Sequence, residues 1–221
     1  EPTSMKVIDA HKGIDAYRTR VTGREAHSSM PELGVNAIAA AAALVCELER
    51  LGTDIAARQN DPRFEPPFST ISVGTIRGGT APNIVPKHCE FQWQVRGLPT
   101  AALAEVPRDL AAFAENALLP RMKQASKEAA IDTEVQGSVP AFVAPPDSSA
   151  VTLALQLTGE AETHAVSYTT EAGLFEQAGC PSVVCGPGDI AQAHAADEYV
   201  AIAQLEACMA FLEGLAGKLS D

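Results

Sequence analysis

Two hydrophobic periods alternate along the first two thirds of the chain, and their order constrains the fold more than any other feature. Extended segments repeat apolar residues at every second position, and helical segments repeat them at every third or fourth. In chain order there is an extended segment at 5–23, a helical segment at 36–51, two extended segments at 69–79 and 88–97, a helical segment at about 101–127, and an extended segment at 131–139. Strand, helix, strand, strand, helix, strand is the order of a ferredoxin-like βαββαβ unit. We therefore expect one α+β domain over residues 13–139.

Two glycines are expected to mark boundaries inside this unit. Gly52 follows helix 36–51 and is the residue type that favours the position after a helix end, so the helix should stop there. Gly13 interrupts the alternating pattern of 5–23 and predicts a turn.

The last third of the chain has a different pattern. After the Pro-rich joint 140–147, helices and short strands alternate as in an α/β layer with mainly parallel strands. The expected elements are helix 148–159, strand 163–167, helix 171–178, strand 181–186 and helix 205–219. Two short strands cannot cover their own faces, so we expect residues 140–221 to belong to a larger α/β domain whose other strands come from elsewhere.

Composition excludes several classes of protein. The apolar fraction of 46% is too high for a disordered chain. With 16 Lys and Arg against 28 Asp and Glu, the formal charge is −12, which disfavours a nucleic-acid partner. The longest apolar run, Ala37–Cys46, is about half the roughly 20 residues that a membrane span needs. We therefore expect no nucleic acid and no membrane among the partners.

The N-terminus and the cysteines bear on the cell compartment. The sequence begins with Glu1 and Pro2, without the charged and apolar regions of a signal peptide. Its five cysteines are scattered and lack C-x-x-C spacing, so neither a disulfide framework nor a zinc ribbon is indicated. A reducing cytoplasm is the expected location.

Two histidines occupy loops where chemistry is common. His194 follows strand 181–186 in a Gly- and Pro-rich loop, and is interpreted either as a metal ligand or as a surface histidine. His27 is followed by Ser28 and Ser29 and then by the first helix, which fits either a turn residue or a Ser–His pair. No G-x-S-x-G elbow accompanies that pair.

Other polar residues lie at strand or helix ends. The loop GGTAPN between two strands is weak evidence for a close approach to a ligand. Arg96, at the end of a strand, suits either a bound carboxylate or an ordinary strand terminus. His88 and Cys89 face opposite sides of one strand, so a shared metal is not expected. Thr170 and Glu171 precede a helix, and capping is their default interpretation.

Taken together, these segments resemble one known family. The chain runs from EPTSM and AHKG through HSS-x-P-x-x-GVNAI, GGTAPNIVP and Q-V-R-G-L-P to TTEAGLF and GPGDIAQAH-x-x-DEY. This order resembles the dinuclear-zinc M20 metallopeptidases, and among them the acetylornithine deacetylase branch. The resemblance covers essentially the whole chain.

The resemblance implies a fold and a reaction. Members have a zinc catalytic domain interrupted by a ferredoxin-like lid, so residues 1–12 would end the first catalytic segment, 13–139 would form the lid and 140–221 would be the returning catalytic segment. The implied activity removes the acetyl group from N-acetyl-L-ornithine in arginine biosynthesis. The implied assembly is a cytoplasmic homodimer formed by the lid. The implied cofactor is zinc, two ions per intact active site, with cobalt as a substitute.

The resemblance also assigns roles to five residues outside the metal site. His27 and Asn83 match lid residues that reach across the dimer to bind the substrate carbonyl or the tetrahedral oxyanion. Arg96 matches the arginine that binds the substrate's α-carboxylate. Thr170 and Glu171 match the substrate-side loop.

The metal site departs from the family pattern. Glu1 and His194 each match one zinc ligand, but the family's H-x-D and Glu-Glu motifs are absent from the 221 residues, and we expect them N-terminal to Glu1. A catalytic zinc normally has about three protein ligands, so the fragment should be inactive alone. A non-catalytic dimerisation module and a related M20 aminoacylase or dipeptidase remain as alternatives.

Overall fold

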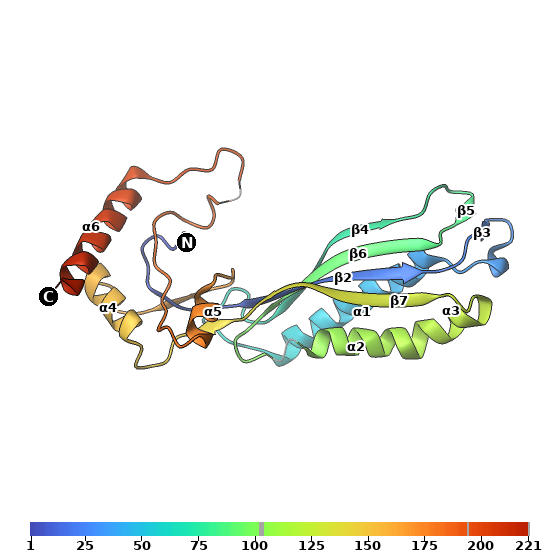
Figure 1. Cartoon of the computed structure of the whole chain (residues 1–221), viewed down its shortest axis with the longest axis horizontal. Coiled ribbons are helices and arrows are strands. Elements are labelled where there is room, and N and C mark those ends of the chain that lie inside the picture. The colour runs from blue at the N-terminus through green and yellow to red at the C-terminus, as the bar shows by residue number, and fades with distance from the viewer. Residues whose placement is uncertain (102–103, 194, 221) are drawn as a thin grey trace. The chain divides into compact units, whose positions relative to one another are not determined.

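The chain folds into two compact units, each with its own hydrophobic core. The computed structural model (Figure 1) describes residues 1–101, 104–193 and 195–220. The insert unit comprises residues 14–61 and 66–138. The terminal unit comprises residues 1–13, 62–65 and 139–221.

A four-stranded sheet forms the centre of the insert unit. Its strand order is β4 (Thr70–Gly78), β6 (His88–Gly97), β2 (Gly13–Thr22) and β7 (Ala130–Val139). β4 and β6 are antiparallel, with Thr70 opposite Arg96. The first and third strands of the βαββαβ order are central and the second and fourth lie at the edges. The expected α+β, ferredoxin-like fold class is therefore confirmed.

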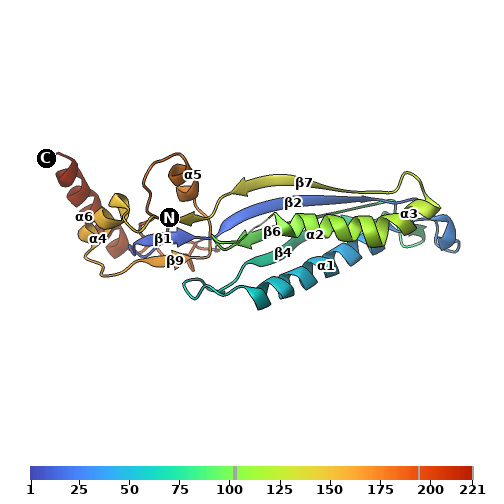
Figure 2. The same cartoon turned by 90° about the horizontal axis from the view of Figure 1, so that it is seen from below.

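Helices cover one face of this sheet (Figures 1 and 2). They are α1 (Ala37–Arg58), α2 (Glu105–Phe113) and α3 (Leu119–Ala125), with the π-helical turn η2 (Ala114–Leu118) between the last two. Alternation along β6 builds the core, because Phe91, Trp93 and Val95 are buried and the residues between them face the other side. Trp93 also donates its indole N–H to Thr19 Oγ1 at 3.0 Å, which satisfies a buried polar group.

The boundaries of α1 and β2 differ from the sequence expectation. Asn36 caps α1 as its side chain accepts from Ala39 N, but the helix continues through Gly52 to Arg58. The continuation buries Ile55, which outweighs the cost of one glycine inside a helix. The predicted turn at Gly13 is also wrong, because β2 begins there. A Cβ at Gly13 would lie 2.7 Å from Ala141 N, so the glycine permits a close backbone approach.

The second predicted helix, 101–127, is also shorter than expected. It begins only at Glu105 and changes to π-helical geometry at Ala114. Residues 102 and 103 of that prediction lie outside the described residues.

A three-stranded sheet forms the centre of the terminal unit. Its order is β8 (Phe142–Val143), β1 (Ile8–His11) and β9 (His164–Val166), with β1 and β9 parallel. The helices of this unit are α4 (Ser149–Thr158), α5 (Ala172–Gln177) and α6 (Ile202–Leu219). Ser148 caps α4 and Gly159 ends it with a φ of +73°, as expected of a glycine stop.

Two predictions for the terminal unit need correction. Residues 181–186 do not form a strand, because only Val184 makes a ladder contact, an isolated antiparallel bridge to Ile8. Pro181, Gly186 and the following Pro limit regular pairing around it. The last helix begins at Ile202 and not at Leu205.

One face of α6 remains apolar and exposed. We call Ile202, Leu205, Met209 and Leu212 the α6 stripe; they recur at helical spacing and are 45–74% exposed. Within the described ranges, none of the helices combines the length and the apolarity that crossing a membrane requires.

Candidate functional site

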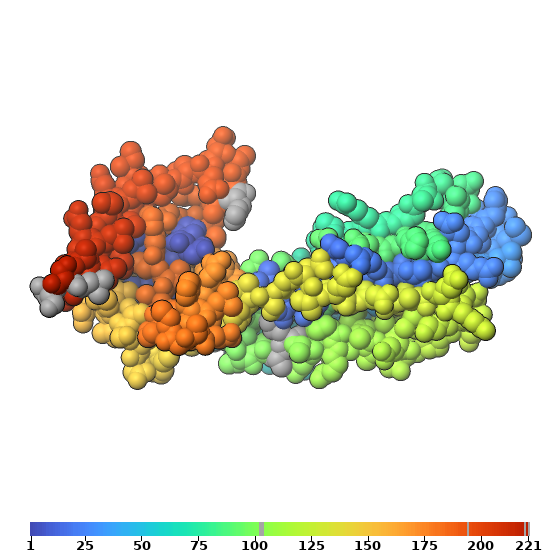
Figure 3. Space-filling view, viewed as in Figure 1, coloured from blue at the N-terminus to red at the C-terminus, as the bar shows by residue number. Residues whose placement is uncertain are grey.

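A small two-stranded antiparallel sheet at one end of the insert unit brings His27 and Asn83 together. β3 (Ala26–His27) pairs with β5 (Ile84–Val85), and Ser28 N donates to Asn83 O at 3.0 Å. In the space-filling view the blue and green segments that carry these strands lie side by side (Figure 3). The residues are 56 positions apart in sequence, and both are exposed. The sequence analysis named both residues but missed the two short strands that join them.

Close backbone packing holds this two-stranded sheet. Gly23 directly follows β2 and donates its N–H to Lys87 O, and a Cβ there would overlap the Val35 carbonyl oxygen. Gly79, in the GGTAPN loop, has a φ of +77°, a conformation that favours glycine. The two glycines thus let separate segments meet beside His27.

The imidazole of His27 contacts the second of the two following serines. Its Nδ1 lies 2.8 Å from Ser29 Oγ and accepts from Ser29 N at 3.2 Å. Met30 N donates to His27 O at 2.9 Å, which closes the turn. The Ser–His contact that the sequence left open is therefore present, with the histidine accepting from the backbone.

Arg96 lies on β6, on the sheet face away from the helices. It is half-buried, and burial lowers the pKa of its guanidinium from the usual value while leaving it charged at neutral pH. The same face carries a charged cluster in which Arg20 Nε lies 2.8 Å from Glu90 and Arg20 also pairs with Glu134.

Glu1 lies two residues before a turn, Thr3 to Lys6, that is fixed to the GPGD loop of the terminal unit. Thr3 Oγ1 accepts from Gly186 N at 3.0 Å, and a Cβ at Gly186 would lie 2.5 Å from the Glu1 carbonyl oxygen. The structure therefore places Glu1 beside the loop that leads toward residue 194. His194 itself lies outside the described residues.

A concavity of about 240 Å³ lies next to this turn. Tyr168 lines it and donates its hydroxyl to Pro2 O at 3.3 Å. Burial is the largest cause that raises the pKa of Tyr168 to about 12, and the nearby carboxylates of Glu1 and Asp189 contribute in the same direction. The phenol therefore stays protonated. The sequence analysis did not single out Tyr168, although it directly precedes the Thr-Thr-Glu motif.

Thr170 and Glu171 lie at the start of α5. Thr170 is 5% exposed and its Oγ1 accepts from Ala172 N at 3.0 Å, a local turn bond. Glu171 is exposed and, although it occupies the capping position, its side chain makes no capping hydrogen bond. The capping interpretation thus fits the threonine and not the glutamate. Thr169 Oγ1 donates to Lys12 O at 2.8 Å and ties this loop to the residue directly after β1.

The sequence analysis also missed His11, which is fully buried in the AHKG segment. Its Nδ1 lies 2.9 Å from Lys12 O, and its Nε2 has no hydrogen-bond partner among the residues that the structure describes. The ring lies 5.5 Å from that of Phe142. Burial lowers the pKa of His11, and the carboxylates of Glu1 and Glu171 oppose the shift only partly.

Acidification is therefore expected to destabilise the terminal unit through His11. Because its pKa is lower in the folded than in the unfolded chain, the unfolded state binds more protons below about pH 6.5. The His11 contribution should be constant above that pH and should lower the free energy of unfolding by up to about 1.4 kcal/mol per pH unit below it. Denaturant unfolding followed by circular dichroism from pH 8 to pH 5 measures the slope. His11→Gln should flatten it; parallel curves for the two proteins would contradict the assignment.

The described residues do not by themselves fit the dinuclear zinc site that the resemblance implies. Among them, no three His, Cys, Asp or Glu side chains lie close enough together to hold a metal ion. Glu1 alone offers one carboxylate, and a catalytic zinc needs about three protein ligands.

Comparison with known proteins identifies the family. Residues 9–122 match the M20 peptidase dimerisation domain. The chain belongs to the M20 peptidase family. It is 37% identical to the acetylornithine deacetylase of Yersinia pseudotuberculosis serotype O:1b and 36% identical to that of Proteus mirabilis. Each comparison spans 206 residues, 93% of this chain and 51% of the relative.

Solved structures of two peptidases share the fold. Aminopeptidase PepT from Bacillus cereus superposes with a TM-score of 0.71 at 19% identity, over 100% of this chain and 56% of that chain. A tripeptidase from Staphylococcus aureus superposes with a TM-score of 0.69 at 18% identity, over 97% of this chain and 54% of that chain. At these identities the likeness shows the fold alone. The chain spans about half the length of the curated relatives it matches.

Proposed function

We propose that this chain forms the lid and the returning catalytic segment of a deacetylase that removes the acetyl group from N-acetyl-L-ornithine, in the cytoplasm and for arginine biosynthesis. The observation that carries the proposal is 37% identity, over 93% of this chain, to proteins named acetylornithine deacetylase. The division into catalytic residues 1–12, lid residues 13–139 and catalytic residues 140–221 belongs to the same proposal.

Three lid residues have the chemistry that this reaction needs. The imidazole of His27 and the amide of Asn83 are exposed hydrogen-bond donors at one two-stranded sheet, suited to an acyl oxygen that gains negative charge in the transition state. The planar guanidinium of Arg96 suits a bidentate contact with the substrate's α-carboxylate. Thr170 and Glu171 are proposed to line the substrate side of the terminal unit.

Zinc remains part of the proposal, with Glu1 and His194 as one ligand of each ion. The described residues do not supply the rest of the coordination, so the remaining ligands would come from polypeptide outside this chain.

The homodimer is likewise proposed. The match to a peptidase dimerisation domain supports it, and both edges of the insert-unit sheet are strands with mainly exposed side chains, β4 and β7. An exposed edge strand offers unpaired backbone groups to a second copy. In this arrangement His27 and Asn83 would act on the active site of the partner.

The α6 stripe supports a larger catalytic domain. Four large apolar side chains at 45–74% exposure on one helix face are unusual for a complete soluble domain. The three-stranded sheet of the terminal unit is also small for an α/β domain.

The test uses this chain together with the polypeptide that matches the other half of the relatives' length. We expect acetate release from N-acetyl-L-ornithine, measured by an acetate-coupled assay, and loss of that activity with a chelator. A panel of N-acetyl amino acids and dipeptides is the control. Preference for another substrate would favour the aminoacylase or dipeptidase alternative, and no hydrolysis by the metal-loaded protein would favour the dimerisation module.

A further inference from the structure

We infer that Ser29 is a positioning residue that holds His27 in the neutral tautomer with its proton on Nε2. Two groups of Ser29 lie at one ring nitrogen, Nδ1: the backbone N–H at 3.2 Å and the hydroxyl at 2.8 Å. A backbone N–H can only donate, so Nδ1 must offer its lone pair. In a neutral imidazole the proton then resides on Nε2.

The backbone around His27 favours this arrangement. β3 pairs with β5 on one side of the residue, and the Met30 N to His27 O bond closes the turn on the other. The two contacts at Nδ1 join the ring to Ser29, two residues further along. Among the residues that the structure describes, none hydrogen-bonds to Nε2, and His27 is exposed. Nε2 is therefore not engaged by the described residues around it.

The consequence for chemistry rests on the proposed function. With its proton on Nε2, a neutral His27 donates a hydrogen bond to an acyl oxygen without transferring the proton. In the opposite tautomer Nε2 carries a lone pair, which repels the same oxygen. Ser29 would thus decide whether His27 stabilises the oxyanion or opposes it.

Nitrogen NMR of this chain tests the inference without any activity. Long-range proton–nitrogen correlation, at a pH where the histidines are neutral, reports which ring nitrogen of each histidine carries the proton. We expect His27 to populate the Nε2–H tautomer more completely than His88, an exposed histidine on β6 that serves as reference. Ser29→Ala keeps the backbone N–H donor and removes the hydroxyl, so it should move the ratio of His27 part of the way toward that of His88, whereas Ser29→Thr should retain it.

Ser28→Ala is the matched control, because Ser28 reaches Asn83 through its backbone and its change should leave the ratio of His27 as it is. A predominant Nδ1–H tautomer, or an unchanged ratio in a folded Ser29→Ala variant, would overturn the inference. In the complete deacetylase, Ser29→Ala should lower kcat by about 2- to 12-fold at constant KM, the loss of one hydrogen bond. Because the NMR result does not depend on hydrolysis, it stands or fails separately from the proposed function.

Discussion

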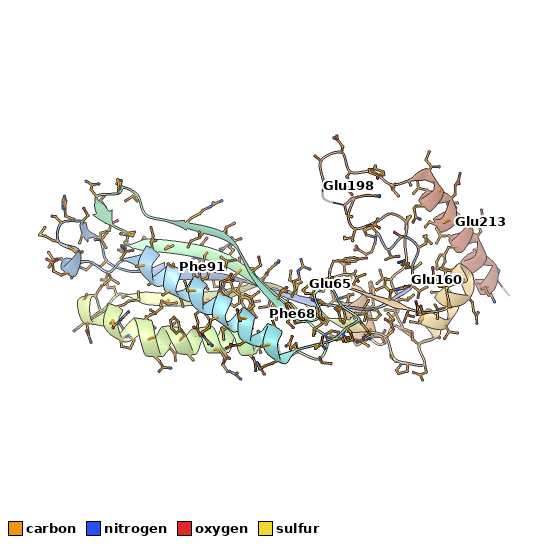
Figure 4. All side chains as sticks on the ribbon, turned by 180° about the vertical axis from the view of Figure 1, so that it is seen from behind. Glu65, Phe68, Phe91, Glu160, Glu198 and Glu213 are labelled. Atoms are coloured by element: carbon orange, nitrogen blue, oxygen red, sulfur yellow. The ribbon has the colours of Figure 1, made fainter. Side chains whose placement is uncertain are left out.

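Replacing Phe91 by alanine is expected to lower the free energy of unfolding of the insert unit by about 3–5 kcal/mol. Phe91 is 0% exposed and lies in the core between the sheet and the helices (Figure 4). Truncation removes apolar surface and leaves a cavity that the packed neighbours fill only partly. Whole domains are stable by only about 5–15 kcal/mol, so much of the unit's stability would be lost.

Trp93 reports on this unit alone, because it is the single Trp of the sequence, is 2% exposed and stacks on Tyr17 at 4.3 Å. Trp93 fluorescence recorded during denaturant unfolding gives the midpoint of the unfolding transition. Gln92→Ala, at the neighbouring position on the exposed side of β6, is the matched control and should change stability by less than about 0.5 kcal/mol. Equal midpoints for the two variants would show that Phe91 does not anchor the core.

The insert unit was predictable because both of its periodicities are local. Along β6 the sequence alternates between Phe91, Trp93 and Val95 and polar residues, and α1 repeats apolar residues at helical spacing. The end of α1 was not predictable from Gly52, because Ile55 contributes to a core formed by distant strands. Tertiary packing decided that boundary and overrode the local stop signal.

The terminal unit was less predictable, because its pairing is mostly non-local. β1 pairs with β8 and β9, more than 130 positions later in the chain, and such contacts leave little trace in local periodicity. The predicted strand at 181–186 has the apolar content of a strand, but only Val184 finds a partner.

Motif resemblance found candidate site residues that periodicity could not. Nothing local joins His27 to Asn83, yet the β3–β5 pairing brings their backbones together. The motifs contained Ser29 and His11 as well: a Ser–His pair was one interpretation of the segment with Ser29, and no role was indicated for His11. The hydrogen bonds at Nδ1 of His27 and the burial of His11 emerge only from the folded chain.

Replacing His27 by alanine in the complete, metal-loaded form of the proposed deacetylase is expected to lower kcat by about 10²- to 10³-fold. The proposed role of His27 is to donate from Nε2 to an oxygen whose negative charge grows in the transition state. A contact that strengthens only in the transition state lowers the barrier without tightening substrate binding. Its loss should therefore reduce kcat and change KM little. Steady-state kinetics with N-acetyl-L-ornithine measures both constants.

His88→Ala is the matched control, because His88 is an exposed histidine of the same unit, at the start of β6, with no assigned role. It should retain kcat within about twofold, since surface substitutions away from a site have small effects. The Trp93 fluorescence midpoint should be unchanged in both variants, because both histidines are exposed. A His27→Ala enzyme with the kcat of the His88→Ala enzyme would remove His27 from the reaction. The amide of Asn83 and the Arg96 contact to the carboxylate would then be the lid's remaining proposed contributions.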